Sequence, residues 1–121
     1  MKISEILDEA ISLEACEKAV DWALENPDAT ILDLIARKPA WAAWGATNIE
    51  RITGSDLDAC IAGTNDYGRG GIGRDRADLT PAQLDDCIAG TNADGRGGIG
   101  SYRADLTPAQ RAACKRSAEE V

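Results

Sequence analysis

The chain has 121 residues, a net charge of −8 at neutral pH and no histidine. Its length predicts one domain with a modest core over residues 1–121, and its acidity argues against direct binding of nucleic acid, which requires clustered lysine and arginine. Because histidine is the commonest general base and the commonest zinc ligand, its absence favours a protein without metal, cofactor or catalytic set.

The amino-terminal residues 1–10 are acidic and amphipathic, unlike a secretory signal. No apolar run approaches the roughly 18 residues that a membrane-spanning helix needs. The expected location is therefore the cytoplasm, with no membrane partner. In that reducing compartment the four cysteines do not imply disulfides.

Helical patterns fill the first third of the chain. Residues 3–25 carry an apolar stripe at helical spacing and are predicted to form helix in two pieces. An Asn-Pro pair at 26–27 is expected to end this helix and suits the cap and first position of a new one, which continues over residues 30–37. Pro39 then opens an alanine- and tryptophan-rich helix at 40–47.

The second half repeats itself at an offset of 27 residues. The segments 60–65 and 87–92 both contain CIAGTN, and the segments 68–73 and 95–100 both contain GRGGIG. A fixed period of this size is typical of stacked helical repeats. Sliding the frame backwards predicts an all-α stack of about three and a half helix-turn-helix repeats, with an N-terminal helical cap at 1–25, repeats near 26–52, 53–79 and 80–106, and a truncated repeat at 107–121.

The first helix of each repeat has clear start and stop signals. Thr80 and Gln83 fit a capping box, and Gly90 is expected to adopt the left-handed conformation that ends many helices. The glycine-rich second helix is ambiguous, because four interior glycines cost about 4 kcal/mol relative to alanine. Helix is favoured over a structured loop, since the aligned segment 41–46 has a helical composition.

Three cysteines, Cys60, Cys87 and Cys114, occupy the same repeat position. Successive helical layers lie about 8–10 Å apart, which is too far for a disulfide. These side chains are therefore expected to be small buried thiols.

The GRGGIG segments suggest one alternative function. They match the letters of a dinucleotide-binding fingerprint, but no apolar strand precedes either copy. Glycine-flanked amides beside arginine can also hold anions. The alternative is therefore a small anion- or nucleotide-binding module that uses Arg69, Gly70, Arg96 and Gly97, on a locally basic face extended by Arg74, Arg76 and Arg103. No nucleophile is paired with a base, so an enzyme is not expected.

Acidic residues and tryptophans gather in the first half of the chain. Residues 1–62 hold 12 acidic and 5 basic side chains, against 9 and 8 in residues 63–121. An acidic surface favours a basic protein partner, and exposed tryptophans would anchor it; core packing is the other interpretation of the tryptophans. The expected contact residues are Glu5, Asp8, Glu9, Glu14, Glu17, Asp21, Glu25 and Asp28, with Trp41 and Trp44 as anchors.

Two short motifs in this region carry a resemblance. The sequence ACxxAVxW at 15–22, followed by PAWAAW at 39–44, resembles a segment of small uncharacterised phage-encoded proteins. The repeat half is similar to helical-repeat arrays in general. The resemblance implies a phage setting and action in the cytoplasm of the host. Small acidic phage proteins are often inhibitors of host defence, including anti-CRISPR proteins, so it implies a non-catalytic inhibitor of a host nucleic-acid-binding complex with a basic surface.

Overall fold

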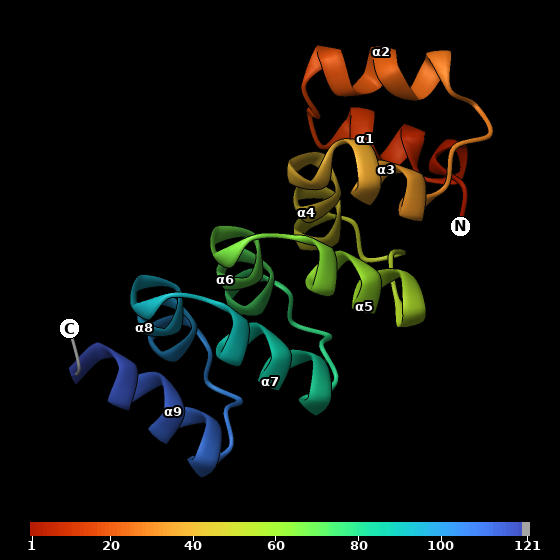
Figure 1. Ribbon diagram of the computed structural model, residues 1–121. Helices are drawn as coiled ribbons and strands as arrows, with labels where there is room; N and C mark the ends of the chain where they lie inside the picture. Colours follow the sequence, from red (N-terminus) through yellow and green to blue (C-terminus); the bar gives the residue numbers. More distant parts are fainter. Residues whose placement is uncertain (120–121) are drawn as a thin grey trace. The chain divides into compact units, whose positions relative to one another are not determined.

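The computed structural model describes the backbone of residues 1–119 and the side chains of residues 1–115. Within this part the secondary structure is helical, and the only β-type pairing is an isolated bridge between Lys2 and Thr30 (Figure 1). The predicted all-α class is therefore confirmed.

The helices fall into two compact units, with the division after Gly63. The first unit contains a short 3-10 helix, Ile3–Glu5, and the helices α1 (Leu7–Ser12), α2 (Glu17–Glu25), α3 (Ile31–Arg37), α4 (Pro39–Asn48) and α5 (Gly54–Gly63). The second unit contains α6 (Asp66–Asp75), α7 (Pro81–Gly90), α8 (Ala93–Tyr102) and α9 (Pro108–Glu119). The division lies inside the predicted repeat 53–79 and not at a repeat edge.

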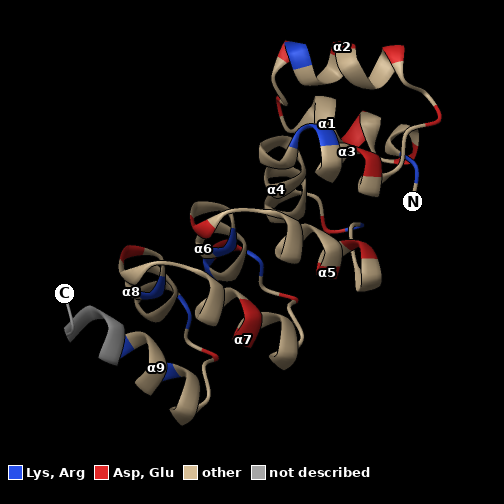
Figure 2. Ribbon diagram, in the orientation of Figure 1, with Lys and Arg blue, Asp and Glu red and all other residues tan. Residues whose placement is uncertain are grey.

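The first unit is held together near the amino terminus by main-chain bonds between distant segments. The Ile3 amide donates to the Ala29 carbonyl at 2.9 Å, and the Ile31 amide donates to the Met1 carbonyl at 3.1 Å. Ile3, Ile6 and Ile31 are buried. Burying such side chains contributes about 1.5–3 kcal/mol each. Helix α2 lies between these two bonded segments in the chain, and it carries several charged residues (Figure 2).

The predicted helix start at 26–27 is wrong. Asn26 only ends the preceding helix α2, which was also predicted, and its side-chain amide donates to the Trp22 carbonyl at 2.9 Å. The next helix starts four residues later, because Thr30 and Asp33 form a reciprocal capping box that satisfies two helix-end donors at once. The first predicted repeat therefore has a shorter leading helix than the later ones.

Both glycine-rich segments are helices, as predicted. Asn65 and Asn92 cap them, each accepting a bond from the amide three residues later, at 2.9 and 2.8 Å. Ile72 and Ile99 are completely buried within them. Because α6 and α8 pack on each other through their glycines, the close contact offsets the low helix propensity of glycine. Helices α4, α6 and α8 have bounds that differ by 27 residues.

The expected left-handed stop at Gly90 is wrong. Among the glycines that the structure describes, only Gly54 has a left-handed backbone, with φ of 57°. Gly90 is needed for space: an added Cβ would collide with Cδ of Arg69. Gly63 likewise faces Cγ2 of Ile35. Helix α7 ends simply because Thr91 turns to an extended conformation.

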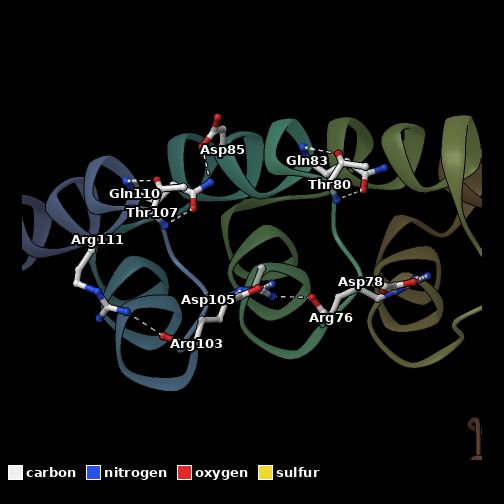
Figure 3. Close-up of polar contacts among 11 residues, drawn as sticks. Arg76, Asp78, Thr80, Gln83, Asp85, Arg103, Asp105, Thr107, Gln110 and Arg111 are labelled. Atoms are coloured by element: carbon white, nitrogen blue, oxygen red, sulfur yellow. Dashed lines mark hydrogen bonds and ion pairs between the residues drawn. The ribbon is translucent and has the colours of Figure 1, made fainter.

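The capping boxes predicted for the second unit are confirmed (Figure 3). The Thr80 hydroxyl accepts from the Gln83 amide at 3.1 Å, and the Gln83 side chain accepts from the Thr80 amide at 3.0 Å. Thr107 and Gln110 repeat this geometry at the start of α9. The Gln110 side chain also donates to Asp85 at 2.9 Å, which links α9 to α7.

Two arginines expected on a basic face are buried instead. The side chains of Arg76 and Arg103 are 2% and 4% exposed, and each forms a two-pronged ion pair with the aspartate two residues later. Arg103 also donates to the Gly73 carbonyl at 3.0 Å and to the Arg76 carbonyl at 2.6 Å (Figure 3). The hydrogen bonds that the Arg103 guanidinium donates to Asp105 lower the pKa of this carboxyl group below its ordinary value. The arginines are therefore part of the scaffold.

Candidate functional site

Three of the predicted contact residues share one side of α2. Glu17, Asp21 and Glu25 follow one another at intervals of four residues, which aligns their side chains along a helix. All three are exposed, and none of them forms an ion pair within the described part of the chain. Like charges at this spacing destabilise a helix by about 0.2–0.5 kcal/mol per pair. We call this solvated row the acidic stripe.

Three other predicted contacts interact with the protein itself. Glu9 pairs with Arg51 at 2.8 Å, and Asp28 pairs with Lys2 at 3.6 Å. Glu5 accepts a bond from the Lys2 amide at 2.7 Å. The two ion pairs are exposed, so each contributes little to stability, but they partly neutralise Glu9 and Asp28. The Glu5 carboxylate keeps its charge but is engaged by the backbone. The eight predicted acidic contacts are thus not equivalent.

Asp8 and Glu14 are exposed and have no ion pair among the described residues. Asp8 lies in the first turn of α1, where a negative charge stabilises the helix dipole. Glu14 follows the end of α1 and has a left-handed backbone, with φ of 61°. Its amide donates to the Ile11 carbonyl, and the Ala15 amide donates to the Ala10 carbonyl. This is the Schellman ending, in which glycine usually occupies the left-handed position.

The tryptophans line a pocket in the first unit. The pocket has a volume of about 410 Å³ and is walled mostly by apolar side chains, including Ile3, Ile6 and all three tryptophans. The Trp22 and Trp41 rings meet edge to face, with centroids 6.4 Å apart. Trp41 and Trp44 are part-buried in the wall. We call this cavity the tryptophan pocket.

Sequence reasoning placed Trp41 and Trp44 on one helix but missed the pocket. Trp22 lies on a different helix, α2, and Ile3 and Ile6 come from the amino-terminal segment. No local pattern connects these positions. The available signal was weak: all the tryptophans of the chain fall within its first third.

The arginines of the alternative anion site bind main-chain carbonyls of one helix. Arg69 donates to the Gly90 carbonyl at 3.2 Å, and Arg96 donates to the Ile88 carbonyl at 2.8 Å. Both acceptors lie in the last turn of α7, where a positive charge is favourable. These contacts give both arginines a structural role and leave them poorly placed to hold a free anion.

The two glycines of that alternative site have different surroundings. Gly70 is buried, and a Cβ there would lie 2.8 Å from Oγ1 of Thr91 and 3.1 Å from Cα of Gly95. Gly97 occupies the same repeat position but has no atom within 4 Å of a would-be Cβ. The first glycine is needed for helix packing, whereas the second is not.

The cysteines differ in accessibility. Cys60, Cys87 and Cys114 are buried, as predicted, and Cys16 is exposed beside the tryptophan pocket. Burial raises the pKa of the Cys87 thiol to about 12 and also raises the pKa of Cys114. Since the thiolate is the reactive form, these two thiols are protonated and inert at neutral pH.

We expect only Cys16 to react when the native protein meets excess N-ethylmaleimide at neutral pH. The three buried thiols should react only after unfolding in denaturant, because unfolding restores access to all three and an ordinary pKa to Cys87 and Cys114. Mass spectrometry of the labelled peptides measures the order of reaction, and Cys16→Ser should abolish the native-state labelling. Native labelling of Cys87 at a rate similar to that of Cys16 would contradict the burial described above.

Other classes of site find no support in the described residues. Among the side chains that the structure describes, those of residues 1–115, no group of three or more histidine, cysteine, aspartate or glutamate residues is placed to hold a metal ion. No helix within residues 1–119 combines the length and apolar character that crossing a bilayer requires. The chain matches no protein-family model, and comparisons with curated proteins and with solved structures return no significant similarity.

Proposed function

We propose that the protein is a non-catalytic recognition module that binds a basic protein surface through the acidic stripe of α2. The single observation that carries this proposal is the row Glu17, Asp21 and Glu25, exposed and without ion pairs among the described residues. A row of like charges is unfavourable for an isolated helix. A basic partner would relieve that repulsion and would be steered to the surface by its field.

In its sharpest form the proposal is a phage-encoded inhibitor of a host defence complex that binds nucleic acid. The acidic stripe would then occupy a basic groove that normally holds nucleic acid, in the cytoplasm of the host. The net charge of −8 and the acidic bias of the first half support this form. The engagement of Arg69 and Arg96 with helix carbonyls makes the anion-binding alternative the weaker candidate.

The repeat half would serve as scaffold for this surface. We infer a short stack of 27-residue helix-turn-helix repeats, supported by the matching bounds of α6 and α8 and of α5 and α7. The recurring pairs of a buried arginine with an aspartate two residues later also support this repeat architecture. In repeat proteins each unit gains its stability from its neighbours.

The test is a capture experiment with matched charge variants. The immobilised protein is exposed to bacterial proteins retained on heparin, a fraction enriched in basic nucleic-acid-binding proteins. We expect a captured protein to be lost with Asp21→Lys/Glu25→Lys and kept with Asp86→Lys/Asp94→Lys, since both doubles change the net charge equally. The control sites are exposed and lie on α7 and α8.

Two results would separate the forms of the proposal. Release of the captured protein by excess single-stranded nucleic acid is expected for the inhibitor form. If capture depends on the acidic stripe but nucleic acid does not release the captured protein, the inhibitor form is refuted and the broader form is kept. Equal capture by both double variants would refute recognition through α2.

A further inference from the structure

We propose that the tryptophan pocket binds a small organic cation with an apolar body, such as an alkylammonium ion. The proposal does not depend on the acidic stripe or on a protein partner. Its starting point is the pocket itself, whose volume of about 410 Å³ lies in the range of sites for small molecules, about 300–1,000 Å³. The first unit alone supplies the whole lining.

The apolar part of the ligand follows from the lining. The lining is mostly apolar and includes isoleucines from the amino-terminal segment and three indole rings. The indoles are incompletely buried, so part of their surface faces the cavity. Displacing water from such a wall by an apolar body is favourable in proportion to the area covered.

The positive charge follows from two features of the same lining. Glu14 is the only lining residue that carries a charge, and a carboxylate favours a cation over a neutral or anionic group. Tryptophan has the strongest attraction for cations among the aromatic side chains. Trp41 already attracts one, since Nζ of Lys38 lies 5.3 Å from its ring centroid.

The backbone at Glu14 gives an independent reason to assign it a role. A left-handed conformation is unfavourable for a residue with a side chain, and glycine would fit this helix ending without strain. Strained residues of this kind occur preferentially at functional sites. A glutamate kept in the pocket lining at the expense of local strain fits a ligand-binding role better than a purely structural one.

The test uses three probes with one tail and different charge: octyltrimethylammonium, octanol and octyl sulfate, each below its aggregation concentration. Because all three tryptophans of the chain line the pocket, tryptophan fluorescence, excited at a wavelength that the tyrosines do not absorb, reports on this site. We expect saturable binding of the cation, roughly tenfold weaker binding of the alcohol, and weaker binding still of the sulfate. Bound cation should also slow alkylation of Cys16, which lines the same pocket.

Two variants distinguish a ligand-binding role of Glu14 from a structural one. Glu14→Gln should reduce cation binding several-fold, to near that of octanol, and should leave octanol binding unchanged. Glu14→Gly should raise the melting temperature and still lose the preference for the cation. Glu17→Gln, on the acidic stripe, is the matched control and should change neither.

Three results would overturn the proposal. Failure of all three probes to bind would show that the pocket accepts no such ligand. Equal or tighter binding of octyl sulfate would indicate a site for anionic amphiphiles. An unchanged preference for the cation in Glu14→Gln would remove the role given to this carboxylate. None of these results depends on the capture experiment.

Discussion

Arg103→Ala is expected to lower the free energy of unfolding by about 2–5 kcal/mol, because two buried carbonyl groups lose their donor at about 1–3 kcal/mol each. The side chain is 4% exposed and joins three groups: the Asp105 carboxylate and the carbonyls of Gly73 and Arg76. Its removal leaves both carbonyls without this donor in a buried place. A loss of this size is a large part of the stability of a small protein, about 5–15 kcal/mol. Denaturant titration followed by circular dichroism measures it.

Arg74→Ala is the control for this prediction. Arg74 also pairs with an aspartate, Asp75, at 2.8 Å, but both side chains are more than 40% exposed. An exposed pair contributes about 0–1 kcal/mol. Arg103→Lys keeps the charge but loses the planar fork that reaches three acceptors, so an intermediate loss is expected. Equal losses for Arg103→Ala and Arg74→Ala would contradict the structural role of the buried arginine.

Gly70→Ala and Gly97→Ala are expected to change stability in opposite directions, although both replace the same repeat position. At Gly70 the new methyl group would meet Thr91 and the Gly95 backbone. The Thr91 hydroxyl donates to the Asp66 carbonyl at 2.7 Å and cannot move away without losing that bond. Overpacking of this kind costs about 1–3 kcal/mol.

Gly97 lies within helix α8, and a methyl group there would meet no other atom. The only effect of Gly97→Ala is then the higher helix propensity of alanine. Gly97→Ala should therefore raise the free energy of unfolding by about 0.5–1 kcal/mol. Thermal melts of the two variants, measured side by side, give the comparison. A stabilising Gly70→Ala would show that α6 and α8 do not approach each other as closely as described.

Local features of the fold could be predicted from the sequence because their partners lie close in the chain. Thr80 and Gln83 form a capping box three residues apart, and Asn92 caps α8 by the same spacing. The prediction that Asn26 caps a new helix was wrong because asparagine suits both ends of a helix. Here its amide group binds the carbonyl of the preceding helix, so it serves as an ending.

Features that depend on distant contacts could not be predicted in this way. The motif Arg-Ala-Asp occurs at 76–78 and at 103–105, but its charges gave no sign that the arginines are buried. Only the packing of α6 against α8 brings the carbonyl of Gly73 to Arg103. The strain at Glu14 was equally hidden, since the position after Leu13 holds a glutamate and not the glycine that would mark a left-handed ending.

The candidate site was predicted in part. The acidic bias of the first half indicated the part of the chain in which the acidic stripe lies, because charge is visible in composition. Which carboxylates remain unpaired was not visible: Glu9 is engaged by Arg51, 42 residues away along the chain. The tryptophan pocket needs side chains from the amino-terminal segment, α2 and α4 together, and so it requires the tertiary structure.

The central claim is that recognition takes place on α2 and not on the glycine-rich helices. Hydrogen exchange of the full chain, free and bound to the protein captured from the heparin fraction, tests it most directly. The claim predicts slower exchange of the amides in Glu17–Glu25 on binding, with α6 and α8 unchanged. Slower exchange confined to Asp66–Asp75 and Ala93–Tyr102, with α2 unchanged, would contradict it.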